Sequence, residues 1–282
     1  MEMDSASGAG LAAHVRAHLS GLRETEARVA QVVLDKGAEL VHLSVSDVAA
    51  LAGTAPSSVV RACQRLGFRG YQELKIAAAR QAPAEPPSRE RDPAARALAD
   101  TVRAAREALD GVAATVTPQR LREAAGLLDG AGRILVVGAG LSGAVALDTA
   151  YRLRALGCAV DAPADPLTAQ LAAAQLTSGG ACLAISHTGA TRTTVDVART
   201  ARRSGAGVLA LTSYARSPLS EAADCTLVAG GQDLVFGLET VASRLAHLTV
   251  VDALALTLLG LRGEPAHAAL RTAADVTVDH SY

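Results

Sequence analysis

Two short apolar runs in this chain each lead directly into a loop of glycines and hydroxyl residues, and each loop opens a helical pattern. The run RILVV precedes GAGLSG (138–143), and the run ACLAI precedes SHTGAT (186–191). Further runs rich in Val, Leu and Ala alternate with helical stretches between residues 133 and 229. Since strands buried on both faces are apolar throughout, this alternation predicts a parallel sheet flanked by helices.

The chain of 282 residues is long enough for two domains. The stretch QAPAEPPSRERDP (81–93) is rich in proline and charge, which is typical of a linker. We therefore expect an all-α N-terminal domain over residues 1–81, a linker over 82–93, and an α/β domain with leading helices over 94–282.

The composition excludes several classes of protein. Aromatic residues make up 2% of the chain and Trp is absent, which argues against a reader that stacks single-stranded bases. The net charge of −1 argues against nonspecific polyanion binding. We expect no metal site, because the four cysteines form no C-x-x-C pair and because His247 and His267 have no partner at metal-ligand spacing. We also expect no cofactor. The first eleven residues lack the basic start of a signal peptide, so we expect a cytoplasmic protein without a membrane partner.

The N-terminal region carries the pattern of a helix-turn-helix. A helical stripe over Thr25–Lys36 is followed by a helix capped by Ser44 with Asp47, a stop at Gly53, and a new helix at Pro56. We expect Val59, Val60 and Leu66 to pack inward. The outward and basic residues that we expect to contact DNA are Ser57, Ser58, Arg61, Gln64, Arg65, Arg69 and Lys75.

This region resembles the N-terminal domain of the RpiR family of bacterial regulators. The resemblance rests on ETEARVAQVVL, on HLSVSDVAALAGTAPSSVVRACQRLGF and on the closing GFRGYQELK. It implies binding to a double-stranded DNA operator. Gln64 stands where a basic residue is usual in the family, which puts the usual affinity or site preference in doubt.

The two glycine loops suit a phosphate. Glycine lets the backbone approach an anion, and the N-terminus of a helix offers free N–H groups. The second loop adds the hydroxyls of Ser186, Thr188 and Thr191. GAGLSG also fits the dinucleotide fingerprint G-x-G-x-x-G, with Asp161 about 20 residues further on. From the residues alone, a nucleotide site therefore stays open beside a sugar-phosphate site.

Residues 121–261 resemble a sugar isomerase (SIS) domain, the ligand domain of RpiR regulators. The resemblance rests on GAGLSG, AISHTGATRTTVDVA, GVLALTS and FGLETVASRLAHLTVVDAL. It implies that Ser142, Ser186, Thr188 and Thr191 bind the phosphate of a phosphosugar, with Gly140 and Gly189 allowing close backbone approach. We add three residues to the expected site: Gly143 in the first loop, His187 as a residue that shapes the second loop, and Glu239 as a contact to a ligand hydroxyl.

Together the two resemblances predict a DNA-binding transcriptional regulator that senses a phosphorylated sugar as its effector. Because a helix-turn-helix protein reads two half-sites, we expect a homodimer or a homotetramer. We predict that it is not an enzyme. The alternatives are an isomerase that uses Glu239 or His187 as its base, and a repressor that senses NAD(P).

Overall fold

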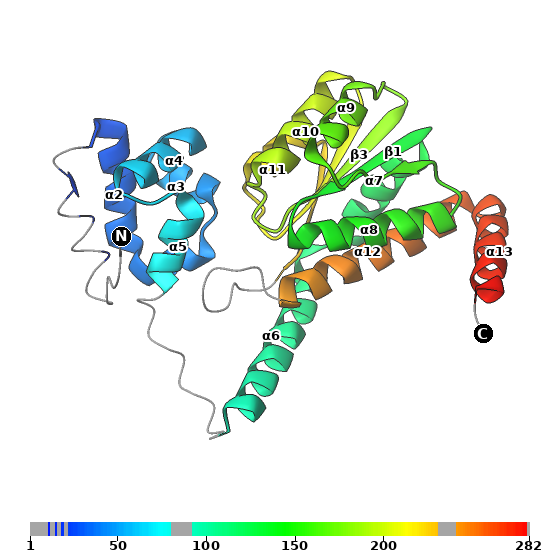
Figure 1. Ribbon diagram of the computed structural model, residues 1–282, viewed down its shortest axis with the longest axis horizontal. Helices are drawn as coiled ribbons and strands as arrows, with labels where there is room; N and C mark the ends of the chain where they lie inside the picture. The colour runs from blue at the N-terminus through cyan, green and yellow to red at the C-terminus, as the bar shows by residue number, and fades with distance from the viewer. Residues whose placement is uncertain are drawn as a thin grey trace. The chain divides into compact units, whose positions relative to one another are not determined.

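A computed structural model of the chain describes residues 11, 15, 18, 19, 22–79, 92–230 and 241–280. Its contacts divide the chain into two compact units, with the division inside α6 (Pro93–Thr115), between Val102 and Arg103. The first unit is helical and the second is α/β, as the sequence predicts (Figure 1). The predicted linker lies almost entirely outside the described residues, so the domain bounds stay predictions.

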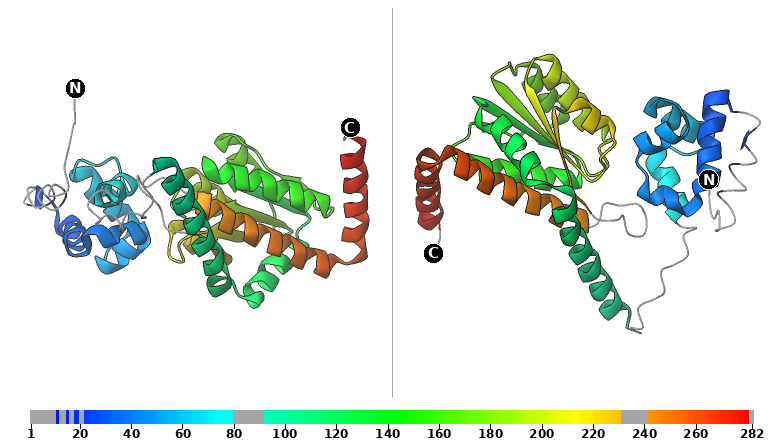
Figure 2. Two further views of the ribbon diagram at one scale, coloured as in Figure 1. Left: turned by 90° about the horizontal axis from the view of Figure 1, so that it is seen from below. Right: turned by 180° about the vertical axis from the view of Figure 1, so that it is seen from behind.

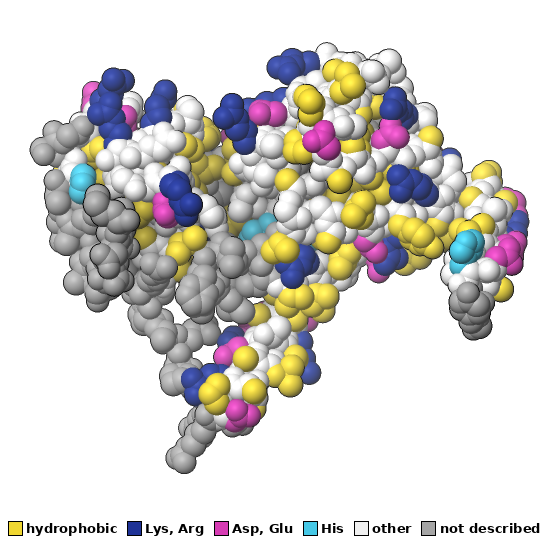
Figure 3. All heavy atoms as spheres, in the orientation of Figure 1, with side chains coloured by type: hydrophobic (Ala, Val, Ile, Leu, Met, Phe, Trp, Pro, Cys, Tyr) yellow, Lys and Arg dark blue, Asp and Glu magenta, His cyan; other side chains and the backbone are white. Residues whose placement is uncertain are grey.

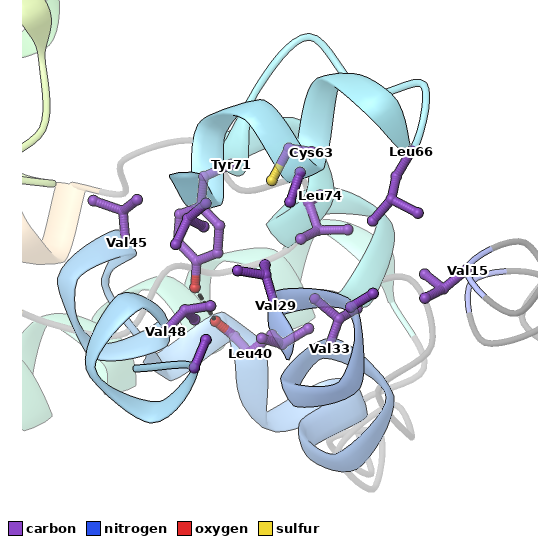
Figure 4. Close-up of a cluster of buried hydrophobic side chains, with 14 of the residues drawn as sticks. Val15, Val29, Val33, Leu40, Val45, Val48, Cys63, Leu66, Tyr71 and Leu74 are labelled. Carbon is purple, nitrogen blue, oxygen red and sulfur yellow. Dashed lines mark hydrogen bonds between the residues drawn. The ribbon is translucent and has the colours of Figure 1, made fainter. Parts of the chain in front are cut away.

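The first unit is a small bundle around an aliphatic core. Its described elements are α2 (Glu24–Lys36), the 3-10 helix η2 (Gly37–His42), α3 (Val45–Leu51), α4 (Pro56–Arg65) and α5 (Tyr71–Ala79). Figure 4 shows Val29, Val33 and Leu40 packed against Leu66 and Leu74. The hydroxyl of Tyr71 donates to the carbonyl of Leu43 over 2.9 Å, so this aromatic ring is buried with its polar end satisfied.

The crossing of α3 and α4 is fixed by local contacts. Ser44 and Asp47 form the predicted capping box at the start of α3. Gly53 has a φ of +60° in the turn that follows. The guanidinium of Arg28, on α2, donates to the carbonyls of Ala52 (3.0 Å) and Gly53 (3.2 Å). The turn between α3 and α4 is therefore tied to α2, which sets the direction of α4.

The second unit contains a five-stranded parallel sheet in the order β2-β1-β3-β4-β5. The strands are β1 (Arg133–Gly138), β2 (Val160–Asp161), β3 (Gly180–Ile185), β4 (Gly207–Thr212) and β5 (Cys225–Val228). One face is covered by α7 (Pro118–Asp129), α8 (Leu141–Ala155) and α12 (Val241–Arg262) (Figure 2). The other face is covered by α9 (Pro166–Ala174), α10 (Arg192–Arg203) and α11 (Pro218–Ala222).

The sheet order brings the two glycine loops to one place. β1 and β3 are neighbours, and Gly138 pairs with Ile185 at their carboxyl ends. After β1 the chain enters α8 on one face, and after β3 it enters α10 on the opposite face. This is a switch point of an open α/β sheet, where a crevice forms outside the carboxyl ends of the strands.

Two long helices, α12 and α13, follow the last strand of the sheet. α13 (Glu264–Asp279), which begins after Gly263, was not predicted. Within the described ranges one helix, α12, is long and apolar enough to span a membrane by length and composition. α12 packs against α7 and α8, and it buries Ala246, Val250, Leu254 and Leu258 at four-residue spacing. We therefore treat α12 as a helix of the α/β unit.

Candidate functional site

The outer face of α4 carries three of the seven predicted DNA-contacting side chains. Ser57, Arg61 and Gln64 are exposed and follow the spacing i, i+4, i+7, so they share one face. Val60 lies on the same face with 37% of its surface exposed, so the expectation that it packs inward is wrong. The buried stripe is Val59, Ala62, Cys63 and Leu66 instead, and successive helical residues are rotated by about 100°.

Two of the residues expected at this face are buried. Ser58 is 8% exposed, and its Oγ accepts a hydrogen bond from Nη2 of Arg61 over 3.2 Å. Lys75 is 3% exposed, because α5 turns this position into the domain together with Tyr71 and Leu74. The expectation that Ser58 and Lys75 present their side chains to DNA is therefore not supported. The buried Ser58 instead accepts a hydrogen bond that orients the side chain of Arg61.

The two remaining cations form ion pairs within the domain. Nε of Arg65 lies 3.5 Å from the buried carboxylate of Glu26, and Nε of Arg69 lies 3.3 Å from Glu73. The side chain of Arg69 is 91% exposed, so this pair is a weak surface contact. Both arginines are exposed at the protein surface.

In the second unit, α8 and α10 begin in an unusual way. Neither has a side chain that caps its first N–H groups, and neither has an acidic residue in its first turn. By contrast, α7, α9 and α11 are capped by Thr117, Asp165 and Ser217. The first turns of α8 and α10 therefore have no side-chain cap, although the N–H of Gly143 donates to the carbonyl of Gly140 over 3.0 Å. Both helix starts keep a positive dipole end, which favours an anion.

One hydrogen bond joins the second loop to the first turn of α8. The backbone N–H of His187 donates a long hydrogen bond to Oγ of Ser142, over 3.4 Å. Within the second loop, Oγ of Ser186 donates to Oγ1 of Thr191 (3.1 Å), and Oγ1 of Thr188 accepts from the N–H of Ala190 (3.2 Å). The structure thus brings together the residues that the sequence placed on two separate loops.

The two positive-φ glycines of the loops have different surroundings. Gly140 has a φ of +58°, and a Cβ built there would meet open space. Gly189 has a φ of +60°, and a Cβ built there would collide with Ser217 and lie 2.9 Å from Oγ1 of Thr212. The N–H of Leu219 also donates to the carbonyl of Gly189 over 2.9 Å. Gly189 is therefore required by close packing against the start of α11.

A chain of three polar side chains lies beneath the second loop. Nδ1 of His187 lies 2.7 Å from Oγ of Ser213, and Oγ of Ser213 lies 3.1 Å from Nε2 of His247 on α12. The Ser213 hydroxyl has only one proton, so it donates a hydrogen bond to one histidine ring and accepts a hydrogen bond from the other. Burial, followed by the neighbouring His187, lowers the pKa of His247 to about 4. Both rings are buried, and His187 anchors its loop to α12 through Ser213.

The sequence reasoning did not single out Ser213. The sequence could have indicated Ser213, because it directly follows β4, the strand next to β3 in the sheet. Three neighbouring parallel strands, β1, β3 and β4, therefore end in hydroxyl-bearing loops at the same edge.

A cavity of about 450 Å³ lies beside the starts of α8 and α10. It is lined by the glycine loop (138–140 and Gly143), by the β2–α9 connection (162–166), and by Thr193 and Thr194 in the first turn of α10. Ser142, Ser186, Thr188 and Thr191 do not line this cavity. Thr193 and Thr194 are candidate site residues that the sequence reasoning missed. Glu239 lies outside the described residues.

Asp161, the acidic residue of the dinucleotide fingerprint, takes part in an ion pair. Oδ2 of Asp161 accepts from Nε of Arg133 over 2.7 Å, and the pair lines a separate hollow. Asp161 is thus held by an ion pair outside the cavity next to GAGLSG. Within the part of the chain that the structure describes, no three His, Cys, Asp or Glu side chains gather as metal ligands. None of the four thiols forms a disulfide, and burial raises the pKa of Cys63 and Cys182 to about 12.

Both halves of the chain match known protein families. Residues 9–84 match the helix-turn-helix domain of the rpiR family, and residues 127–257 match the SIS domain. The regulator HexR of Pseudomonas aeruginosa is 32% identical over 264 residues, which cover 88% of this chain and 89% of HexR. An uncharacterized HTH-type transcriptional regulator of Caldanaerobacter subterraneus is 30% identical over 247 residues, which cover 85% and 87%.

Solved structures share the fold. Vibrio vulnificus NanR, solved in complex with ManNAc-6P, matches with a TM-score of 0.82 at 24% identity, over 96% of this chain and 99% of that one. The sugar isomerase domain of an RpiR transcription factor from Sphaerobacter thermophilus matches with a TM-score of 0.57 at 25% identity, over 63% and 98%. The two domain matches and the two relatives identify the family, and the solved structures agree in fold. The chain is a transcriptional regulator of the RpiR family, with an N-terminal helix-turn-helix domain and a C-terminal SIS domain.

Proposed function

We propose that the SIS domain binds a phosphorylated sugar and that this binding changes the affinity of the helix-turn-helix domain for its operator. The observation that carries the proposal is the pair of uncapped helix starts, on α8 and α10, that meet at one switch point. A dianionic phosphate is complementary to both dipoles. NanR, which shares the fold, was solved with the phosphosugar ManNAc-6P.

In this proposal the phosphate lies at the loops and the sugar body extends into the neighbouring cavity. The first-turn N–H groups of α8 and α10 bind phosphate oxygens, with Gly140, Gly143 and Gly189 shaping the backbone. The hydroxyls of Ser142, Ser186, Thr188 and Thr191 exchange their present bonds within the loops for bonds to the ligand. A volume of about 450 Å³ lies in the range of small-molecule sites.

The remaining ligand residues have supporting roles in the proposal. His187 holds the second loop from beneath through its bond to Ser213. Glu239, which precedes α12 in the sequence, contacts a sugar hydroxyl. Thr193 and Thr194 extend the list, because they line the cavity from the first turn of α10.

For DNA, we propose that α4 enters the major groove. Arg61 and Gln64 read base edges, and Ser57 meets the backbone at the start of the helix. Exposed Val60 is suited to the methyl group of a thymine. Arg65 and Arg69 contact phosphates. A homodimer that acts in the cytoplasm would read two half-sites spaced by about one helical turn, roughly 34 Å.

We propose that the phosphosugar is bound without turnover. The relatives are named transcriptional regulators. His187 is a poor candidate for a catalytic base, because it is 4% exposed and its Nδ1 is engaged by Ser213. The ligand acts by linkage, since it binds one arrangement of the two subunits better than another and thereby changes the spacing of the DNA-binding domains.

The proposal is tested by selecting DNA sites with the full-length protein and then titrating the selected duplex by fluorescence anisotropy. A panel of sugar phosphates is compared with the same sugars lacking phosphate. We expect at least one phosphosugar to change the Kd for DNA by about 5-fold to 150-fold, the usual range of allosteric coupling. The matching dephosphorylated sugar should leave the Kd unchanged. A Kd that responds to NAD(P) and to no phosphosugar would contradict the proposal.

A further inference from the structure

Arg244, in the first turn of α12, is a half-buried cation that forms no ion pair with the residues that the structure describes. Its Nη1 is buried and has no hydrogen-bond partner among them. Figure 3 shows Lys and Arg side chains standing out at the surface, several of them beside Asp or Glu. A buried N–H of a charged group that lacks an acceptor costs stability, so the environment of Arg244 favours the approach of an anion.

The position of Arg244 on its helix strengthens this argument. The first turn of a helix carries the positive end of the helix dipole, which repels a cation. The first turn of α12 contains no acidic residue that would offset this repulsion. Arg244 is therefore unfavourable where it lies until a negative group binds beside it.

The side chain of Arg244 leaves α12 on the side of α8. The two helices contact each other and run side by side (Figures 1 and 2). Both begin at the carboxyl edge of the sheet, since α8 follows β1 and His247, near the start of α12, contacts Ser213 directly after β4. Ala255 lines a hollow between the two helices. Arg244 lies eleven residues before Ala255, about three helical turns, so both residues share this side of α12.

Along the axis of α8, Arg244 is level with the first turn of that helix. Nη1 of Arg152 on α8 lies 2.5 Å from Oδ1 of Asp252 on α12, so these two residues are at the same height. Arg244 lies eight residues before Asp252, and Ala144 lies eight residues before Arg152. Because parallel helices rise equally per residue, Arg244 lies beside residues 141–144, where the first glycine loop enters α8.

The charge balance of the proposed phosphate site calls for such a cation. A phosphate monoester carries a charge of about −1.5 to −2 at neutral pH. Two helix starts contribute about half a positive charge each, which leaves about one negative charge uncompensated. None of the described residues that line the neighbouring cavity is Lys or Arg. Arg192 opens α10, but its side chain is 93% exposed and pairs with Asp196.

We propose that Arg244 is the cation of the effector site and pairs with the phosphate held at the starts of α8 and α10. The inference rests on the proposed function and adds to it the residue that balances the charge. The guanidinium group presents its N–H groups in a planar fork that matches two phosphate oxygens. The ligand class is a phosphate monoester, whose dianion two helix starts and one guanidinium neutralise together.

Replacing Arg244 tests the pairing by calorimetric titration of the full-length protein with the panel of sugar phosphates, ManNAc-6P among them, and with inorganic phosphate. Arg244→Met removes the charge and keeps an unbranched side chain. We expect it to raise the Kd of each probe that binds the parent by about tenfold or more. Arg244→Lys keeps the charge but loses the planar fork, so its Kd should lie between those of the parent and Arg244→Met.

Stability without ligand separates this role from a structural one. Arg244→Met should resist urea at least as well as the parent, because it removes an unpaired cation from the start of α12. Arg192→Met removes the exposed cation at the start of α10 and is the matched control, with a Kd within about twofold of the parent.

Two results would overturn the inference and leave the proposed function standing. In the first, Arg244→Met binds the probes like the parent. In the second, Arg244→Met loses stability without ligand as well as phosphate binding, which would assign Arg244 a structural role. If no sugar phosphate of the panel binds the parent, the proposed function fails and the inference fails with it.

Discussion

The backbone N–H of His187 lies 3.4 Å from Oγ of Ser142, so the loop after β3 donates a hydrogen bond to the helix that starts after β1. The two residues are 45 positions apart in the sequence. Their contact places the starts of α8 and α10 beside one another at the carboxyl edge of the sheet. An anion bound at one helix start therefore lies close to the other.

Ser142→Ala removes the acceptor of this hydrogen bond. The N–H of His187 is buried, and leaving such a donor unsatisfied costs about 1–3 kcal/mol. We expect a lower free energy of unfolding by denaturant and weaker phosphosugar binding. Ser178→Ala, in an exposed turn, is the matched control and should change neither quantity. Unfolding and ligand titration that both match the parent would show that the bond has no role.

Gly189→Ala should destabilise the protein strongly. The substitution forces a side chain into a positive-φ position and also against Ser217. Gly140→Ala meets the same backbone strain in open space and should cost only about 1–2 kcal/mol. Thermal unfolding of both variants measures the difference. Equal losses would mean that packing at Gly189 contributes nothing beyond its backbone conformation.

The buried His247 predicts a loss of stability in acid. Its pKa is lowered from 6.5 to about 4, first by burial and then by His187. The unfolded chain therefore binds a proton at higher pH than the native state does. The stability contributed by neutral His247 is complete above pH 6.5 and is lost as the pH falls from 6.5 towards 4. Over that window the loss is about 3 kcal/mol.

Urea unfolding between pH 7 and pH 4 measures this loss. In His247→Gln the slope of stability against pH should become shallower, even if the variant is less stable at pH 7. His267→Gln changes an exposed histidine on α13 and should keep the slope of the parent. If the slope of stability against pH in His247→Gln equals that of the parent, the acid sensitivity comes from other groups.

Arg61→Ala should weaken specific DNA binding by about 1–3 kcal/mol, or roughly tenfold to a hundredfold. Arg61 is exposed on α4, and its hydrogen bond to Ser58 orients its side chain. The substitution therefore removes a guanidinium that is already positioned to contact DNA. Anisotropy titration against the selected duplex and a scrambled duplex measures the change. Arg271→Ala, on the surface of α13, is the control and should bind like the parent. Phosphosugar binding should survive in both variants.

Much of the fold was predictable because strong local signals agree with the tertiary structure. Ser44 with Asp47, Pro56 and Gly53 set the bounds of α3 and α4 as expected. The apolar runs gave all five strands, since a parallel sheet buries both faces. α13 was missed, because it buries a single side chain, Ala266, and so has little apolar periodicity to detect.

The site was less predictable, because burial depends on rotation about a helix and on neighbouring elements. Val60 and Val59 are equally apolar, but only one of them can face the core at that point of α4. Lys75 carries a charge that suggests exposure, yet α5 buries it. The role of Gly189 depends on Ser217, which lies in a different loop, so no local pattern could reveal it.

The most direct test of the account is the melting temperature of the parent protein and of Ser186→Ala with Thr191→Ala, measured against a series of sugar phosphates and the same sugars without phosphate. Ligand that binds only the native state raises the melting temperature with concentration. We predict a rise for at least one phosphosugar in the parent, none for its dephosphorylated form, and a rise in the double variant that is lost or needs at least tenfold more ligand. An equal rise with and without phosphate, or an undiminished rise in the double variant, would contradict a phosphate site at the starts of α8 and α10.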